Sequence, residues 1–350
     1  MESSSKHIQL IIGCDEDDKD GKYDKNITYC SFKNKNRILW IVNCPYRIEV
    51  TLGNEFKVEL NAVMPKNNYI NVDNLLIDDN EIDFSQFVVV KDKYYDQYAD
   101  EEEIEEEEEE EEDAEESDKR HKRVNDQNVL MIQVTKEMKE IRFMELRSYP
   151  TVYVKNFHHD TFKLYFENCG SGKVVVANSE VGKVEFNSVN FYLYTKHCTI
   201  GNLIYSSLDK CLVVGSGSKF TGDCKINCAN GWVGLKNCDF SGNNITINLD
   251  TAGLTVTNCI GGNLNIYSIE GEIIFQDYTG NSPLNIVSVA GQVILRKCSS
   301  TSVIKITTVS GEVSFKDCDV NESFVVETIE GVLKLVTGNQ PSFKSLKHSD

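Results

Sequence analysis

The sequence predicts an all-β protein whose main body is a parallel β-helix, or β-solenoid, with coils of about 20 residues. Four glycines recur at a spacing of twenty: Gly271, Gly291, Gly311 and Gly331. On both sides of each glycine apolar residues alternate with polar ones at a period of two, which is typical of strands and excludes a helical repeat. A fixed period of this length marks a repeat whose units bury their apolar faces only by stacking on one another.

The columns around the glycine give each unit two short strands that meet at a Gly corner. Five positions before the glycine stand Ile266, Ile286, Ile306 and Val326. Two positions after it stand Ile273, Val293, Val313 and Leu333. Parallel strands stacked about 4.8 Å apart turn each column into an internal ladder. About nine coils then fit between residues 150 and 339, which makes roughly 45 Å of rod.

The units "SIEGEIIF", "SVAGQVIL" and "TVSGEVSF" resemble the repeat of an adhesin-like β-helix domain family, which is defined only as a domain of unknown function. The resemblance covers about residues 150 to 339. It implies the β-helix fold, and it attaches no catalytic residue to any position. A similarity to pectin-degrading β-helix enzymes is weaker because their coils are usually longer and irregular. A carbohydrate-active β-helix enzyme is therefore the third and least favoured interpretation.

Residues before the repeat predict a small β-rich region over residues 1–95. Its runs "RIEVTL" and "EFKVEL" alternate around Gly53-Asn54, which predicts a two-residue hairpin. The acids in residues 15–23 fit a hairpin turn better than a calcium loop, because Ile27 stands where a bidentate Glu is needed.

The rest of the chain divides into three further parts. Residues 96–126 are expected to form an acidic disordered linker or loop, because a dense run of like charge repels itself and stays extended. The repeat domain then spans residues 127–340. A polar tail, residues 341–350, follows it, and Pro341 would block the end of the ladder because proline cannot donate a ladder hydrogen bond.

Charge and targeting signals limit the classes of partner. The net charge is −19, and sixteen acids lie in residues 100–118. A basic stripe is missing, so no direct nucleic-acid partner is expected. No apolar run is long enough for a membrane span, and the N-terminus fits no secretory signal, which predicts a cytoplasmic protein. The cluster "KRHKR" at 119–123 makes the nucleus the alternative location.

The twelve cysteines are expected to be thiols in a reducing compartment. Cys224 and Cys228 should point into the core together with Ile226, since all three share one side of a strand. Two pairs, Cys238 with Cys259 and Cys298 with Cys318, occupy matching columns of adjacent coils. The cytoplasmic location predicts free thiols there, and secretion would predict bridges.

Other candidate chemistry has a plain structural interpretation. His158, His159 and His197 lack any pattern of nucleophile and base, which predicts surface or packing roles. Asp277 and Asp317 share a column with Lys297 between them, which predicts a charge-balanced turn ladder. The sequence therefore predicts no catalytic residue, no metal site and no cofactor.

The remaining functional signal is on the surface. Five apolar residues at outward positions are expected to form one exposed stripe: Trp232, Tyr267, Ile274, Val287 and Ile294. The stripe is either covered by the N-terminal region or a loop, or it docks a partner. The preferred function is a non-enzymatic β-solenoid binding or structural scaffold that acts through a protein-interaction surface. The alternative is an acidic, histone-chaperone-like nuclear binder of basic proteins.

Overall fold

A computed structural model describes residues 7–14, 23–31, 38–42, 44, 47–54, 57–65, 76–78, 81–83, 129–146, 150–335 and 345–348. Every regular element in these residues is a β-strand. The predictions for the acidic residues 96–126, the basic cluster 119–123 and the turn at 15–22 lie outside the described residues. None of the described segments is a helix that is long and apolar enough to cross a membrane.

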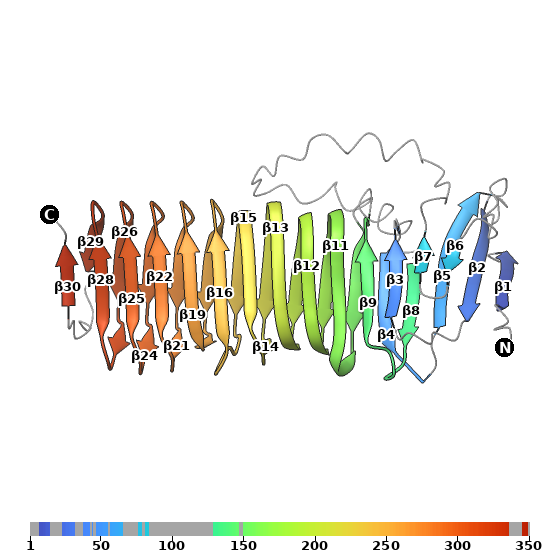
Figure 1. Cartoon of the computed structure of the whole chain (residues 1–350), viewed down its shortest axis with the longest axis horizontal. Helices are drawn as coiled ribbons and strands as arrows, with labels where there is room; N and C mark the ends of the chain where they lie inside the picture. Colours follow the sequence, from blue (N-terminus) through green and yellow to red (C-terminus); the bar gives the residue numbers. More distant parts are fainter. Residues whose placement is uncertain are drawn as a thin grey trace, which may run out of the picture.

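The main body is a β-solenoid of about ten turns over residues 140–334, with coils of about 20 residues, so the predicted fold is confirmed. Figure 1 shows the coils stacked along one straight axis. Each coil has two long faces, A and B, and a short third face, C. Strands on each face pair in parallel with the same segment of the next coil.

Face A is a single ladder of parallel strands. It consists of β9 (Glu140–Met144), the middle of β11 (His158–Ala177), β12 (Glu180–Lys196) and β13 (Thr199–Ser216), the first part of β15 (Cys224–Lys236), β16 (Asn244–Leu249), β19 (Asn263–Ser268), β22 (Leu284–Ser288), β25 (Ile304–Thr308) and β28 (Phe324–Thr328).

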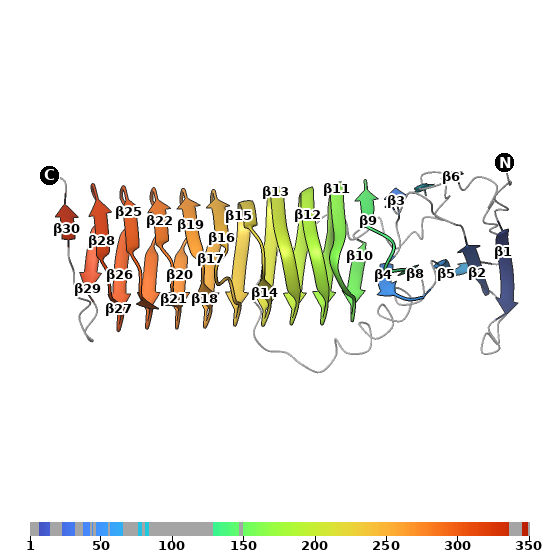
Figure 2. The same cartoon turned by 60° about the horizontal axis from the view of Figure 1, so that its bottom comes forward.

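Face B is the second long ladder. It consists of β10 (Thr151–Lys155), the last parts of β11, β12, β13 and β15, β17 (Gly253–Thr257), β20 (Ile273–Gln276), β23 (Val293–Arg296), β26 (Glu312–Lys316) and β29 (Val332–Leu335). Figure 2 shows the strands of both long faces following one another along the rod.

Face C is short. It uses the first residues of β11, β12 and β13, then β14 (Lys219–Phe220), a bridge at Asp239, β18 (Ile260–Gly261), β21 (Thr279–Gly280), β24 (Ser299–Ser300) and β27 (Asp319–Val320).

The glycine column forms the corner between faces A and B. A Cβ atom added at Gly291 would lie 2.1 Å from the carbonyl oxygen of Gly271, and one at Gly311 would lie 2.1 Å from that of Gly291. Between Gly271 and Gly331 the coils therefore approach too closely at this corner for a side chain, which explains the exact period of these glycines; earlier in the same column stand Cys211 and Ala252. Side-chain hydroxyls close the same corner, because Gly331 N donates to Thr328 Oγ1 over 2.8 Å.

A column of left-handed residues forms the corner between faces B and C. Its φ angles lie between 49° and 59°. The column comprises Asn156, Asn178, His197, Gly217, Asn237, Asn258, Asp277, Lys297 and Asp317. Asn and Asp tolerate this conformation better than other non-glycine residues. Asn258 Nδ2 also donates to Asn237 Oδ1 over 2.7 Å. The predicted turn column of Asp277, Lys297 and Asp317 is thus confirmed, while its charge balance stays a prediction.

The interior is filled by the inward column of each strand. Leu264, Leu284 and Ile304 succeed one another in register on face A and are fully buried. Phe166 and Phe186 stack at 4.4 Å between ring centroids with an interplanar angle of 7°. Identical inward positions therefore bury apolar side chains against those of the neighbouring coil, as the repeat predicted.

The N-terminal strands extend the ladders of the rod. Face A continues from β9 into β3 (Ile38–Val42), then β7 (Glu81–Asp83) and β6 (Leu76–Asp78). Face B continues from β10 into β4 (Arg47–Leu52) and β8 (Val129–Val134). Strands β5 (Lys57–Pro65), β2 (Tyr23–Ser31) and β1 (His7–Cys14) follow in antiparallel order. Figure 2 shows β1 at the end of the rod.

The hairpin predicted at Gly53-Asn54 is wrong. Strand β8 lies between β4 and β5, parallel to the first and antiparallel to the second. Gly53 N donates to Val134 O over 2.8 Å instead of closing a two-residue turn. A partner strand far away in the sequence competes successfully with the local turn. By contrast, β1 and β2 do pair in antiparallel fashion, with Cys14 opposite Asp24, which agrees with the expectation of a hairpin in this part of the sequence.

The C-terminal end carries one further strand. Residues Ser345–His348 of the expected polar tail form β30, which pairs in parallel with β28. This strand adds a rung to face A, while Pro341 lies outside the described residues.

Candidate functional site

The five residues predicted to form one stripe lie on two different faces. Tyr267 and Val287 are register partners on face A and are 49% and 39% exposed. Trp232, Ile274 and Ile294 lie on face B. Ile294 is only 8% exposed, and Ile274 is half-buried. The prediction of a single stripe is wrong because the glycine corner turns the chain between these positions.

A continuous apolar surface does exist at the corner itself. We call it the apolar corner, and it comprises Tyr267, Ile269, Val287, Val289, Val309 and Ile329. These side chains are between 39% and 57% exposed. They lie on four consecutive coils, which are about 4.8 Å apart. Exposed apolar residues that are contiguous in this way mark interaction sites more often than scattered ones do.

The backbone of the apolar corner is held by the ladder on both sides. Val289 N donates to Ser268 O over 3.0 Å, and Val309 N donates to Ser288 O over 3.2 Å. One residue further, Ser310 N donates to Val289 O over 2.9 Å. The exposed side chains thus project from a fixed backbone, so a partner would not have to order a loop on binding.

The sequence reasoning missed four of these six residues. Ile269, Val289, Val309 and Ile329 stand two positions before the repeated glycine, directly after the last strand position of face A. The signal was present: a β-branched aliphatic residue fills this turn position in all four copies, although the inward columns are already occupied by others. A turn position that is apolar in every unit predicts a surface with a role.

Face B carries a second unusual surface in its N-terminal half. Six stacked segments, "TVYVK", "KVVVA", "YLYTK", "LVVGS", "WVGLK" and "GLTVT", contain no Asp or Glu. Their outward positions include four exposed lysines and four aromatic residues. We call this surface the lysine-aromatic face, and its members are Tyr153, Lys155, Lys173, Tyr192, Tyr194, Lys196, Trp232 and Lys236.

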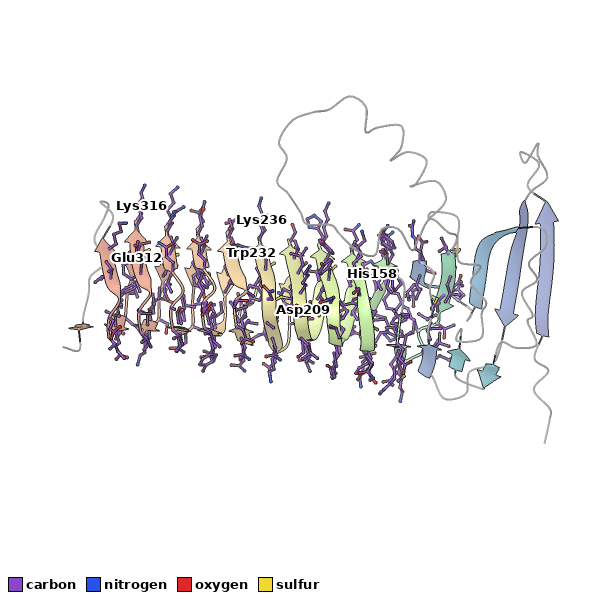
Figure 3. All side chains as sticks on the ribbon, turned by 90° about the horizontal axis from the view of Figure 1, so that it is seen from above. His158, Asp209, Trp232, Lys236, Glu312 and Lys316 are labelled. Atoms are coloured by element: carbon purple, nitrogen blue, oxygen red, sulfur yellow. A yellow bond between two sulfur atoms is a disulfide. The ribbon has the colours of Figure 1, made fainter. Side chains whose placement is uncertain are left out.

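Figure 3 shows how this surface lies on the rod. Trp232 and Lys236 project from one coil, and Glu312 and Lys316 occupy the equivalent places farther along. The acid-free part already ends before Glu272, which follows Gly253 in the column of Trp232. Toward the C-terminus the same face becomes charge-balanced, because Lys334 pairs with Glu312 at 3.5 Å.

Face A of the same coils differs in its charges, because acidic and basic side chains form ion pairs there. Arg142 pairs with Glu140 at 2.9 Å and with Glu167 at 3.2 Å. Lys183 pairs with Glu185 at 2.5 Å. The hydrogen bond from Arg142 to Glu140 also raises the pKa of the guanidinium. These charges of face A thus neutralise one another. In the described part of the chain, the four lysines of the lysine-aromatic face have no carboxylate at ion-pair distance.

The cysteines whose side chains the structure describes are buried, and one pair of them is bridged. Cys211 and Cys228 form a disulfide with Cα atoms 5.8 Å apart, so the prediction that Cys228 is a thiol is wrong. Cys224 is buried and free, as predicted. The pairs Cys238 with Cys259 and Cys298 with Cys318 are also free and buried.

The neighbouring thiols of the adjacent coils interact. The hydrogen bond from Cys298 lowers the pKa of the Cys318 thiol below its usual value. Both sulfurs are enclosed in the core, so the pair offers no surface for a reaction with solutes.

The histidines take packing and corner positions. His159 Nε2 lies 3.1 Å from Lys136 O and 3.0 Å from Met138 O. His197 belongs to the left-handed column with a φ of 52°. Among the described residues no group of three His, Cys, Asp or Glu side chains is arranged to hold a metal ion.

Comparisons with family models, with curated proteins and with solved structures found no match to this chain. The resemblance to the adhesin-like β-helix family therefore stays a prediction. Among the described residues, the apolar corner and the lysine-aromatic face are the two candidate surfaces considered below.

Proposed function

We propose that this protein is a non-enzymatic binding scaffold whose rigid β-helix docks a protein partner on the apolar corner. The observation that carries the proposal is the exposure of six apolar side chains on consecutive coils of one edge. Solenoids commonly present extended surfaces of this kind to their partners.

Two physical features of the apolar corner favour tight docking: its side chains are apolar, and its backbone is already ordered. Burying apolar surface stabilises a complex by about 25 cal/mol per Å². Part of that gain is normally lost when flexible loops are ordered on binding. The ladder hydrogen bonds at Val289 and Val309 already fix the backbone of the corner. The side chains Ile269, Val289, Val309 and Ile329 are also β-branched, so they have few rotamers to lose.

The test is affinity capture with the full chain and with two matched variants. In the first variant Ile269, Val309 and Ile329 are replaced by Ser. In the second Ile260, which is 47% exposed on face C, is replaced by Ser. We expect a defined set of proteins bound by the wild type and by the Ile260→Ser variant, and lost with the corner variant. Circular dichroism confirms that both variants fold.

Salt gives an independent check on the kind of contact. Apolar docking should survive high ionic strength. Capture by charge should weaken, because exposed charges interact only within a screening length of about 8 Å at physiological salt, and this length shortens as salt is added. If the corner variant captures the same proteins in the same amounts, the apolar corner is not the docking surface.

The second candidate is the capture of basic proteins, such as histones, by the acidic run. The observation in its favour is the sixteen acids within residues 100–118, next to the basic cluster at 119–123. Deletion of residues 100–116 should then abolish capture, and so should high salt. A deletion variant that keeps its partners at high salt would exclude this function, and the corner variant separates it from the first proposal.

A further inference from the structure

We propose that the lysine-aromatic face binds an extended acidic polysaccharide whose negative groups recur on every second sugar residue. This inference concerns face B, and it is independent of the apolar corner between faces A and B. It assigns a chemical class of ligand to a surface that the protein-docking proposal leaves unused.

The first step is charge. The whole chain has 55 acids against 36 Lys and Arg, with a net charge of −19. Six consecutive segments of face B nevertheless contain no acid, and Lys155, Lys173, Lys196 and Lys236 stand exposed on them. Lysines that lack a carboxylate partner on an otherwise acidic protein create a local positive potential. Such a surface is complementary to an anion.

The second step is the period of the lysines. Lys155, Lys196 and Lys236 occupy the same outward position at the end of face B in every second coil. Ala177 and Ser216 fill that position in the coils between them. Two coils span about 9.6 Å at the spacing of neighbouring strands. An extended sugar chain advances by a similar distance over two residues, so one acid per disaccharide would meet one lysine.

The third step is the period of the aromatic rings. Tyr153 and Tyr194 stand at equivalent positions two coils apart, and so do Tyr192 and Trp232. Both pairs of rings therefore repeat with the same two-coil spacing as the lysines, the first pair one row and the second pair two rows further in on the face. Aromatic rings combine a large apolar surface with a polar edge. The C–H-rich face of a pyranose ring packs on such a surface while its hydroxyl groups stay accessible.

The fourth step is the orientation of the largest ring. A Cβ atom added at Gly253 would lie 2.1 Å from a ring carbon of Trp232. Because Gly253 is the register partner of Trp232 in the next coil, the indole lies across that coil along the face. The glycine leaves room for a flat platform, and Trp232 is still 37% exposed there. At the other end, the Lys155 ammonium lies 4.3 Å from the centre of the Tyr153 ring.

A single-stranded nucleic acid is the competing polyanion. Its binding sites also combine aromatic platforms with cations. Every nucleotide carries a phosphate, however, and lysines on alternate coils would leave part of that charge without a partner. The strongly acidic chain would also repel so dense a polyanion. The period and the net charge therefore favour the more sparsely charged polysaccharide.

The experiment uses isothermal titration of the full chain with four probes. They are hyaluronan oligosaccharides, in which an acidic and a neutral sugar alternate, oligogalacturonate with an acid on every residue, neutral cello-oligosaccharides and oligo-dT. We expect binding of hyaluronan that is tighter than that of the other three. Trp232→Ala and the double variant Lys196→Gln/Lys236→Gln should each weaken it about tenfold or more.

Matched controls come from face A. Tyr267→Ala removes an aromatic ring of greater exposure, and Lys225→Gln removes an exposed lysine. Both should leave the affinity for hyaluronan unchanged. The lysine variant of face B should also show a weaker dependence on salt than the wild type, since fewer charges contribute.

Several results would overturn the proposal. They are the absence of hyaluronan binding, equal losses in the face A controls, equal or tighter binding of oligogalacturonate or the neutral sugars, and tighter binding of oligo-dT. The last result would assign the face to nucleic acid. The face B variants leave the apolar corner unchanged, so protein capture by the corner is tested separately; of the controls, only Tyr267→Ala alters a corner residue, and it is used here for hyaluronan binding alone.

Discussion

Replacement of Gly291 by Ala should destabilise the solenoid by about 2–4 kcal/mol. The new Cβ would lie 2.1 Å from the Gly271 carbonyl oxygen, whereas ordinary contacts begin at 3.4 Å. The neighbouring atom belongs to the backbone, so two coils must separate by more than an ångström at this corner. Overpacking of this kind typically costs about 1–3 kcal/mol. Weakening of the adjacent hydrogen bond from Ala290 N to Ile269 O, now 2.8 Å, adds about 1 kcal/mol.

Gly234 provides the matched control. A Cβ atom there meets only the Trp232 side chain at 3.7 Å, which is an ordinary contact. Gly234→Ala should therefore be neutral or stabilise by about 0.4–1 kcal/mol through the unfolded state. Guanidinium unfolding followed by far-UV circular dichroism measures both variants against wild type. If Gly291→Ala unfolds at the same denaturant concentration as Gly234→Ala, close packing does not explain the glycine column.

Three further predictions concern individual residues. Lys297 has a φ of 51°, so Lys297→Gly should raise the thermal midpoint by relieving about 1 kcal/mol of strain; a lower midpoint would contradict this reasoning. Burial raises the pKa of the Cys169 thiol from 9.0 to about 12. The part of the free energy of unfolding that depends on the neutral thiol is therefore fully present below pH 9 and is lost as the pH rises from 9 to about 12. Cys169→Ala should reduce that loss, which unfolding titrations at several pH values measure. The Cys211–Cys228 bridge closes a separation of 17 residues, so reduction should cost about 3 kcal/mol. Peptide mapping without reductant should find the bridge, and complete alkylation of both cysteines would refute it.

The sequence determined the architecture of the rod because its information is local and repeated. The column of Ile266, Ile286 and Ile306 is inward in every coil, so one strand pattern fixes all of them. The period of Gly271, Gly291 and Gly311 fixes the length of the coil, since each glycine must stack on the last. The turn ladder of Asp277, Lys297 and Asp317 follows from the same period.

Other features could not be predicted because they depend on contacts between distant segments. The alternation around Gly53 fits a hairpin equally well, and only the arrival of β8, Val129–Val134, decides that β4 and β5 do not pair. Likewise, the disulfide between Cys211 and Cys228 joins two faces whose distance no local pattern gives. Long-range strand pairing outweighed the local turn preference in the first case.

The candidate sites illustrate the same division. The sequence by itself determined that Trp232, Tyr267 and Val287 point outward, because alternation within a strand sets the side of each residue. Only the tertiary structure decided that the glycine corner places Trp232 on one face and the two others on another, and that Ile294 is covered. The three-sided coil also decided which outward positions become neighbours. It gathered four lysines and four aromatic rings into one acid-free surface, since residues about twenty positions apart in the sequence lie one strand spacing apart in space.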